Sequence, residues 1–171
     1  MRLVQAPNQL LRVKTKPVKK ITSAHRQIIQ RMIKLTRTFV DPEGVGLAST
    51  QIGKDEQYFV AKLKSGKFKA FFNPRILSYS KKKRLVVEGC LSIPNYWGKI
   101  QRPAAVTVSY LDEKGQAVKE RLTGQNAHIF QHEYDHLQGK LFMDIVLEQK
   151  AQLFKVTKDK YGTEVFQEVS L

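Results

Sequence analysis

Hydrophobic residues recur at helical spacing in the first quarter of the chain. The apolar positions that share this period are Ile28, Met32, Leu35 and Phe39. Residues three and four apart lie on one side of a helix, and Thr22 or Ser23 can cap its start. Pro42 cannot continue a helix, because it has no backbone N–H. The pattern therefore predicts a helix over residues 23–39.

Short runs of β-branched and aromatic residues follow this helix and predict strands. These runs cover residues 58–60, 68–72, 85–87, 106–110 and 117–122. The last two are joined by a polar turn, 112–115, so they predict a β-hairpin. Residues 153–156 and 164–167 flank the segment 160–162 and predict another small hairpin.

A second helix is expected between these hairpins. It begins near residues 124–126, carries His132 and His136, and ends near Gly139, since glycine commonly caps a helix C-terminus. The order of elements predicts an α+β fold, with antiparallel sheets packed around a central helix and an N-terminal helix. A chain of 171 residues can bury a core without disulfides, and no repeat or linker divides it. We therefore expect one domain over residues 1–171.

Composition narrows the cellular setting of the chain. Its single cysteine, Cys90, cannot form an intramolecular disulfide. No apolar stretch reaches the length of a membrane span, and residues 1–7 lack the apolar run of a secretory signal. We therefore expect a cytoplasmic protein that does not associate with a membrane.

The net charge of +15 has two interpretations. Clusters at 62–69 and 81–84 concentrate it, and such clusters can attach a protein to nucleic acid or to a ribonucleoprotein. They can also form a solvated face that keeps the protein soluble. Lys outnumbers Arg by 21 to 9, which favours the solvated face.

The segment His132-Glu133-Tyr134-Asp135-His136 carries the clearest chemical signal. Imidazoles four positions apart on a helix face the same way and can bind one metal ion, and the Glu between them is a candidate general base. A surface helix with two solvated histidines is the alternative. Apolar neighbours on the same helix, Ile129, Phe130 and Leu137, favour a buried pair and hence metal binding.

Cys90 is the candidate for a third metal ligand. A catalytic tetrahedral site has three protein ligands and leaves one position for water. A lone cysteine is more often a small buried hydrophobe. Cys90, however, lies in Glu88-Gly89-Cys90-Leu91-Ser92, after an apolar strand and before Ile93-Pro94, where irregular backbone can present a thiolate.

The glycine-containing segment 44–51 allows three interpretations. Ser49 stands where a dinucleotide-binding fold requires a third glycine, so the nucleotide interpretation is weak. A flexible turn is the simple alternative. In the functional interpretation, the glycines let the backbone approach a ligand closely and Gln51 directs its amide toward it.

Taken together, these three segments resemble the motifs of the peptide deformylase family, metal hydrolases that remove the formyl group from the N-terminal methionine of nascent chains. Residues 44–51 match G-Φ-G-Φ-A-A-x-Q except at Ser49, residues 88–92 match E-G-C-L-S in full, and residues 131–139 match Q-H-E-x-D-H-L-x-G. The resemblance extends over residues 7–144. The long C-terminal helix of some members is not apparent in this sequence.

The resemblance implies a mechanism and a set of site residues. Cys90, His132 and His136 would bind one divalent metal ion, Fe(II) in many members, although zinc, nickel or cobalt also suit these ligands. The hydroxide on this metal would attack the formyl carbonyl, and Glu133 would act as general acid and base. The oxyanion would be stabilised by two donors, the side-chain amide of Gln51 and the backbone N–H of Leu91.

The resemblance also implies how substrate binds. An extended N-formylmethionyl nascent peptide would add as a strand against Val45, Gly46 and Gly89. We expect a monomer. The family's methionine pocket is built by residues three, four and seven positions before His132, which here are Ile129, His128 and Gln125. His128 and Gln125 predict a polar wall and weaker selection of methionine.

Two other protein classes are weighed against this one. A metallopeptidase of the longer His-Glu-x-x-His type requires a histidine at position 142, where Phe142 stands. Glu164 could replace that ligand, but Cys90 would then have no role. A basic RNA-binding module with a structural metal would need four closed ligands instead of three.

Overall fold

The structure is a computed structural model of the chain and describes residues 1–170. The helices are η1 (Gln9–Arg12), α1 (Ser23–Thr36), η2 (Ser49–Ile52), α2 (Gly124–Leu137) and α3 (Phe142–Gln149), where η marks a 3-10 helix. The strands are β1 (Gly46–Ala48), β2 (Tyr58–Lys62), β3 (Phe68–Tyr79), β4 (Lys83–Cys90), β5 (Ile93–Pro103), β6 (Ala105–Leu111), β7 (Ala117–Thr123), β8 (Gln152–Lys158) and β9 (Glu164–Val169). These helices and antiparallel sheets confirm the predicted α+β fold.

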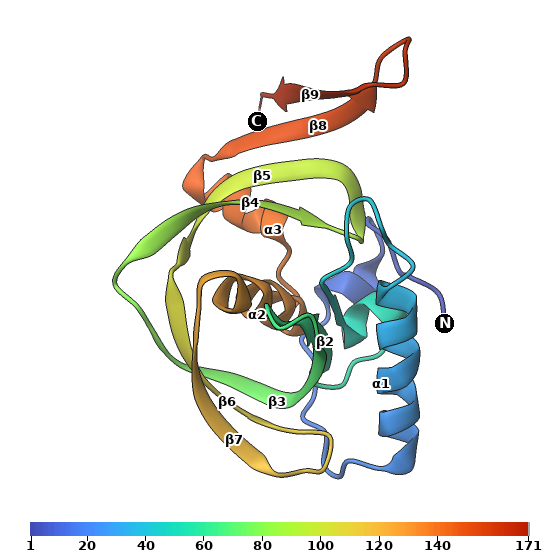
Figure 1. The fold of residues 1–171 in the computed structure, drawn as a ribbon, viewed down its shortest axis with the longest axis vertical. Coiled ribbons are helices and arrows are strands. Elements are labelled where there is room, and N and C mark those ends of the chain that lie inside the picture. Colours follow the sequence, from blue (N-terminus) through green and yellow to red (C-terminus); the bar gives the residue numbers. More distant parts are fainter. Residues whose placement is uncertain (171) are drawn as a thin grey trace.

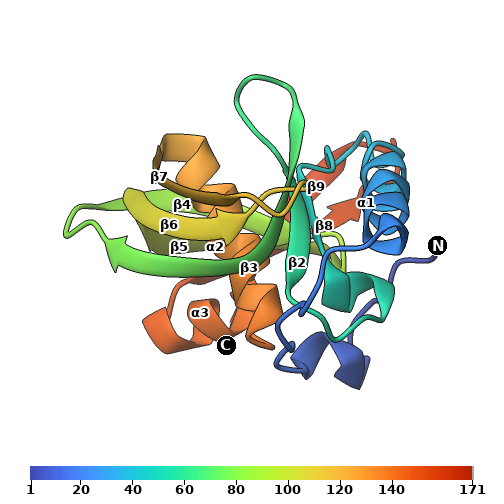
Figure 2. The ribbon, with the colours of Figure 1, turned by 90° about the horizontal axis from the view of Figure 1, so that it is seen from below.

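Two antiparallel sheets enclose the helix α2. The five-stranded sheet has the order β1-β2-β3-β6-β7, and the four-stranded sheet has the order β4-β5-β8-β9. Figure 1 shows α2 at the centre of the molecule, between the sheets, with α1 at one side. Viewed from below, α1 and α3 lie on different sides of the molecule (Figure 2). Strands β1 and β4 are edge strands of their sheets, so each leaves a row of backbone groups unpaired.

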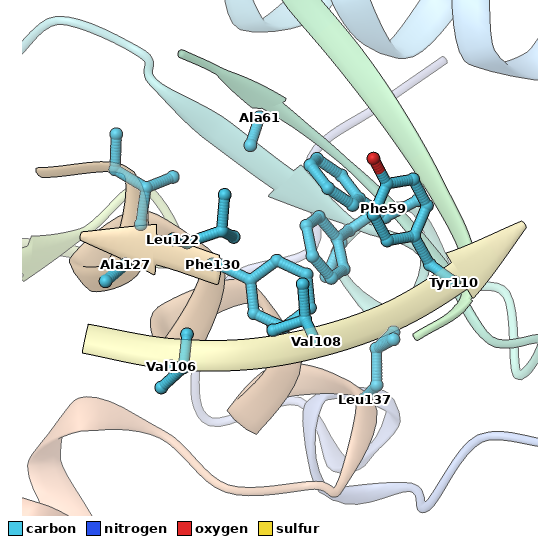
Figure 3. Packing of buried hydrophobic residues seen from close by; sticks show 12 residues of the cluster. Phe59, Ala61, Val106, Val108, Tyr110, Leu122, Ala127, Phe130 and Leu137 are labelled. Atoms are coloured by element: carbon cyan, nitrogen blue, oxygen red, sulfur yellow. The ribbon is translucent and has the colours of Figure 1, made fainter. Parts of the chain in front are cut away.

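An aromatic cluster holds α2 against the five-stranded sheet (Figure 3). Phe59 and Phe71 stack with their ring centroids 4.8 Å apart. The Phe130 ring meets both of them edge-on, at 5.1 and 5.2 Å. Such aromatic pairs add about 1 kcal/mol each beyond the burial of their area. The helix that carries the two histidines is therefore fixed by its own apolar side.

Two further clusters of buried residues pack α1 and α3 against the sheets. Ile29 and Met32 of α1 are buried against the five-stranded sheet, beside Val60 and Phe72. On α3, the buried residues Phe142 and Val146 pack against the four-stranded sheet. None of the helices in residues 1–170 is both long enough and apolar enough to cross a membrane.

Several predicted elements have different bounds in the structure. Helix α1 ends at Thr36 rather than Phe39, because the backbone N–H groups of Thr38 and Phe39 turn back to the carbonyls of Leu35 and Thr36. Strands β3 and β4 are longer than the apolar runs that predicted them. Both predicted hairpins are present, as β6–β7 and β8–β9.

Five elements were not predicted, namely the 3-10 helices η1 and η2, helix α3, and strands β5 and β1. Helix α3 follows α2 closely, with Phe142, Ile145 and Val146 at helical spacing on its buried side. Strand β5 contains the strand breakers Pro94, Gly98 and Pro103, which obscured its pattern. Strand β1 lies in the segment that was interpreted as a turn or a ligand-binding loop.

Candidate metal centre

Three potential metal ligands meet at the end of β4. Cys90 is the last residue of that strand, and His132 and His136 lie one turn apart on α2. The potential ligand atoms of these residues all lie within 4.8 Å of one another. Cys90 Sγ is 3.2 Å from His136 Nε2. The structure therefore brings together the three residues that the sequence suggested as ligands.

A buried carboxylate orients His132. Glu88 Oε1 accepts a hydrogen bond from His132 Nδ1 at 2.6 Å, which leaves Nε2 of that ring free to bind a metal. Arg102 donates to both Glu88 oxygens, at 2.8 and 2.6 Å, and to Asp135 Oδ2 at 2.6 Å. Burial alone would raise the pKa of Glu88, but His132, His128 and Arg102 hold that pKa well below its usual range. The site thus contains a carboxylate that stays charged.

The imidazole of His136 is electrically suited to a metal. Burial, together with the charge of His132, lowers the pKa of His136 well below its usual value. His136 is therefore neutral, which is the form that binds metal ions. Burial would also lower the pKa of His132, but the charges of Glu88 and Cys90 raise that pKa well above its usual value. A metal ion at this site would displace the His132 proton.

Glu133 lies against the backbone of β1. It is buried, and its Oε2 has no hydrogen-bond partner among the described residues. A Cβ atom added to Gly46 would be 2.2 Å from Glu133 Oε1, so only glycine fits there without displacement. Burial raises the pKa of Glu133 to about 7, and a nearby cation would lower it again. Such a carboxyl can accept and release a proton near neutral pH.

Gln51 points its amide nitrogen at the same centre. Its Oε1 accepts from the backbone N–H of Ala48 at 2.8 Å, and its Nε2 donates to Ser92 Oγ at 3.0 Å. Nε2 also lies 3.6 Å from Cys90 Sγ. Ser92 Oγ donates in turn to the Val4 carbonyl at 2.7 Å. The Gln51 amide is therefore held in one orientation beside the thiol.

A cavity of about 140 Å³ opens beside these residues. The predicted site residues on its wall are Val45, Gly46, Gly89, Cys90, Leu91, His132 and Glu133. It lies between the edge strands β1 and β4, where an extended peptide could form backbone hydrogen bonds. The cavity thus connects the candidate ligands to two unpaired strand edges.

The prediction that three residues of α2 form a pocket wall is partly correct. Ile129 and His128 line the cavity, as predicted. Gln125 is exposed and is not part of the wall, so its predicted role was wrong. His128 also does more than line a pocket, because its Nε2 donates to Glu88 Oε2 at 2.8 Å.

Sequence reasoning missed several supporting residues. Glu88 and Asp135 lie inside the recognised motifs, and that position was the available signal for them. No motif marked Arg102, whose side chain joins both carboxylates. Trp97 lines the cavity and Ser92 holds Gln51, and neither role was predicted from the sequence.

The donor set fits a divalent metal with an open coordination position. One thiolate and two imidazoles are common ligands of zinc and of other late first-row metals. Glu133 lines the same cavity, and its Oε2 has no hydrogen-bond partner among the described residues. Among residues 1–170, these three ligands are the only grouping of this kind.

Comparison with known proteins identifies similar chains. The sequence model of the polypeptide deformylase family matches residues 1–152. The chain is 38% identical over 137 residues to a peptide deformylase of Pseudothermotoga lettingae, covering 80% of this chain and 77% of the relative. It is 36% identical over 167 residues to a peptide deformylase of Mesorhizobium japonicum, covering 92% and 93% of the two chains.

Solved structures show the same similarity. The crystal structure of peptide deformylase from Thermotoga maritima superposes with a TM-score of 0.78 at 36% identity, covering 84% of this chain and 95% of that one. A plant peptide deformylase superposes with a TM-score of 0.80 at 32% identity, covering 87% and 82% of the two chains.

Proposed function

The chain belongs to the polypeptide deformylase family and is a peptide deformylase, and we propose that it uses one divalent metal ion, held by Cys90, His132 and His136, to remove the formyl group from N-terminal methionine. The observation that carries this proposal is the convergence of three ligand atoms within 4.8 Å beside the unpartnered carboxyl of Glu133. In this proposal, residues 1–171 act as a single catalytic domain.

The bound metal would supply Lewis acidity toward a water molecule and the formyl carbonyl. Glu133 then takes a proton from the water and delivers it to the leaving amine nitrogen. Burial raises the pKa of Glu133 to about 7 and the bound cation would lower it again, so the carboxylate form that accepts the proton is available at neutral pH. Gly46 leaves room for this carboxyl, because a Cβ atom at position 46 would lie 2.2 Å from Glu133 Oε1.

Two donors serve the oxygen on which negative charge develops. Gln51 Nε2 already points at the centre, and the Leu91 backbone N–H follows Cys90 directly. Fixed donors of this kind contribute about 3–4 kcal/mol to the stabilisation of a transition state. Val45, Gly46 and Gly89 bind the peptide backbone along the two strand edges, which orients the formyl group without selecting a sequence.

The metal, the partners and the location are also proposed. We assign Fe(II) to the centre in the cell, with zinc, nickel and cobalt as metals that the same ligands accept. The chain works as a cytoplasmic monomer on N-formylmethionyl nascent peptides. The charge of +15 solubilises it. Electrostatic association with ribosomes would appear as co-sedimentation that falls steeply with rising salt.

The proposal is tested by the products of the reaction. The metal-loaded protein should release formate from formyl-Met-Ala-Ser and leave the matched acetyl-Met-Ala-Ser intact. Cleavage of internal peptide bonds without formate release would instead indicate a metallopeptidase. Metal binding with no hydrolysis of any peptide would indicate a structural metal site.

A further inference from the structure

The four-stranded sheet has one covered face and one open face. Its inner face packs against α3 through Ile100 and Leu153. Strand register places another set of side chains on the opposite side, since paired residues of antiparallel strands point the same way. The apolar members of this outer face are Leu85, Val87, Trp97, Phe154, Val156 and Phe166. They form a row that crosses all the strands of the sheet.

This row is accessible to a partner. Leu85, Val87 and Phe166 are 56%, 57% and 56% exposed. Trp97, Phe154 and Val156 are half-buried. Large apolar side chains that gather on one open face mark a binding surface more often than isolated ones do.

The row borders the cavity of the metal centre. Val87, Gly89 and Trp97 all line that cavity. The Trp97 ring lies over Gly89, since a Cβ added to that glycine would be 2.9 to 3.0 Å from three indole atoms. From Trp97 the row continues to Phe154 on the neighbouring strand and then to Phe166 on β9. Adjacent strands are about 4.8 Å apart, and Phe166 is paired two residues beyond Phe154, so this part spans about 12 Å, or three to four extended residues.

The charges around the row favour a peptide over RNA. The polar residues of the same face are Lys83, Lys99, Gln101, Gln152, Lys158, Glu164 and Glu168. They carry both signs and two amides, and the glutamates of β9 flank Phe166 directly. A phosphate backbone binds to a continuous stripe of positive charge, and Glu164 and Glu168 prevent such a stripe on this face. Side chains of an unfolded polypeptide, in contrast, suit a mixed apolar and polar surface.

We infer that the outer face of the four-stranded sheet binds the part of the nascent chain that follows the formylmethionine, an inference that rests on the proposed deformylase function. This face would prefer apolar and aromatic residues. The match to the family model ends at residue 152, so Phe154, Val156 and Phe166 lie beyond it. The chain would thus have a substrate-binding surface outside the methionine pocket, built largely by its C-terminal hairpin.

The test compares short and extended substrates. Formyl-Met-Ala-Ser is measured beside two extended versions, one continued with Phe and Leu residues and the other with Gly and Ser residues. We expect the apolar extension to lower KM by about tenfold, which corresponds to partial burial of one aromatic side chain. The double variant Phe154→Ser/Phe166→Ser should lose this preference and keep its kcat/KM on formyl-Met-Ala-Ser.

Two control variants and a binding measurement show whether the preference arises on this face. Val165→Ser changes the opposite side of β9, where Val165 is 38% exposed, and should keep the preference. Phe166→Ser alone alters an exposed position, so it provides the test even if the double variant does not fold. Trp97 is the only tryptophan, so its fluorescence reports binding of the extended peptides without catalysis.

Clear outcomes would overturn the inference. A wild-type protein with equal KM for both extensions, or a double variant that keeps the preference, would refute it. An unchanged preference together with altered sedimentation of Phe166→Ser would assign the row to a second copy of the chain. An unchanged preference with lost ribosome co-sedimentation would assign it to RNA. Failure of all peptides to release formate, with fluorescence binding retained, would refute the proposed reaction and leave this surface standing.

Discussion

The substitution Gly46→Ala should damage proton transfer while sparing the metal ligands. The new Cβ would lie 2.2, 2.7 and 2.9 Å from Oε1, Cδ and Cγ of Glu133. Relaxed contacts need roughly 3.3 Å, so the carboxyl or β1 must move by about 1 Å. Neither moves easily, because Glu133 is buried and β1 is paired with β2.

A displacement of about 1 Å can reduce the rate on the order of a hundredfold. We therefore expect kcat for formate release from formyl-Met-Ala-Ser to fall by about that factor, with metal content unchanged. Overpacking should also cost roughly 1–3 kcal/mol of unfolding free energy. Elemental analysis, steady-state kinetics and thermal unfolding measure these three quantities.

The matched control is Gly115→Ala. Gly115 has a φ of +82° and nothing within 4 Å of an added Cβ, so this substitution strains only a distant turn. It should cost stability of the order of 1–2 kcal/mol and leave kcat unchanged. Wild-type kcat in Gly46→Ala would refute the proposed role of Glu133. Loss of the metal together with kcat would show that this contact supports the metal site instead.

Three further substitutions test other parts of the site and the fold. Cys90→Ser should remove most of the bound metal, because the chain has no other thiolate, and full metal content with full activity would contradict this. His128→Leu should increase the preference in kcat/KM for formyl-Met over formyl-Gln by about fivefold, because it makes the cavity wall more apolar. Gln125→Leu changes an exposed residue and should leave this preference unchanged. Asp144→Asn should lower the unfolding free energy by about 1 kcal/mol at pH 7, because Asp144 pairs with Arg12 and accepts from the Leu141 N–H at 2.8 Å. Burial would raise the pKa of Asp144, but Arg12 and the Leu141 N–H lower it from 3.8. The difference in unfolding free energy between the wild type and Asp144→Asn should therefore be full above pH 3.8 and vanish as the pH falls through the lowered pKa. A difference that does not depend on pH would contradict this role of the Asp144 carboxylate.

The metal ligands could be predicted because their signal is local. His132 and His136 are one helical turn apart, so sequence spacing alone places them on one side of a helix. Cys90 was identified by its uniqueness and by its position at the end of a strand. The family motifs then supplied Gln51, which the fold brings to within 3.6 Å of the thiol.

The supporting network could not be predicted because it depends on tertiary structure. Arg102 reaches Glu88 only because β4 and β5 pair in one register, and Pro94, Gly98 and Pro103 hid strand β5 from its pattern. The contact of Gly46 with Glu133 depends on the packing of β1 against α2. The exposure of Gln125 likewise depends on the rotation of α2, which a spacing rule counted from His132 did not capture.

The central claim is most directly tested by measuring formate release as a function of metal content. The protein is prepared without metal and titrated anaerobically with Fe(II), and the rate on formyl-Met-Ala-Ser is followed at each step. The proposed centre predicts a rate that rises linearly and stops at one metal per chain. A rate that does not depend on added metal, or that continues to rise well beyond one equivalent, would contradict the three-ligand centre.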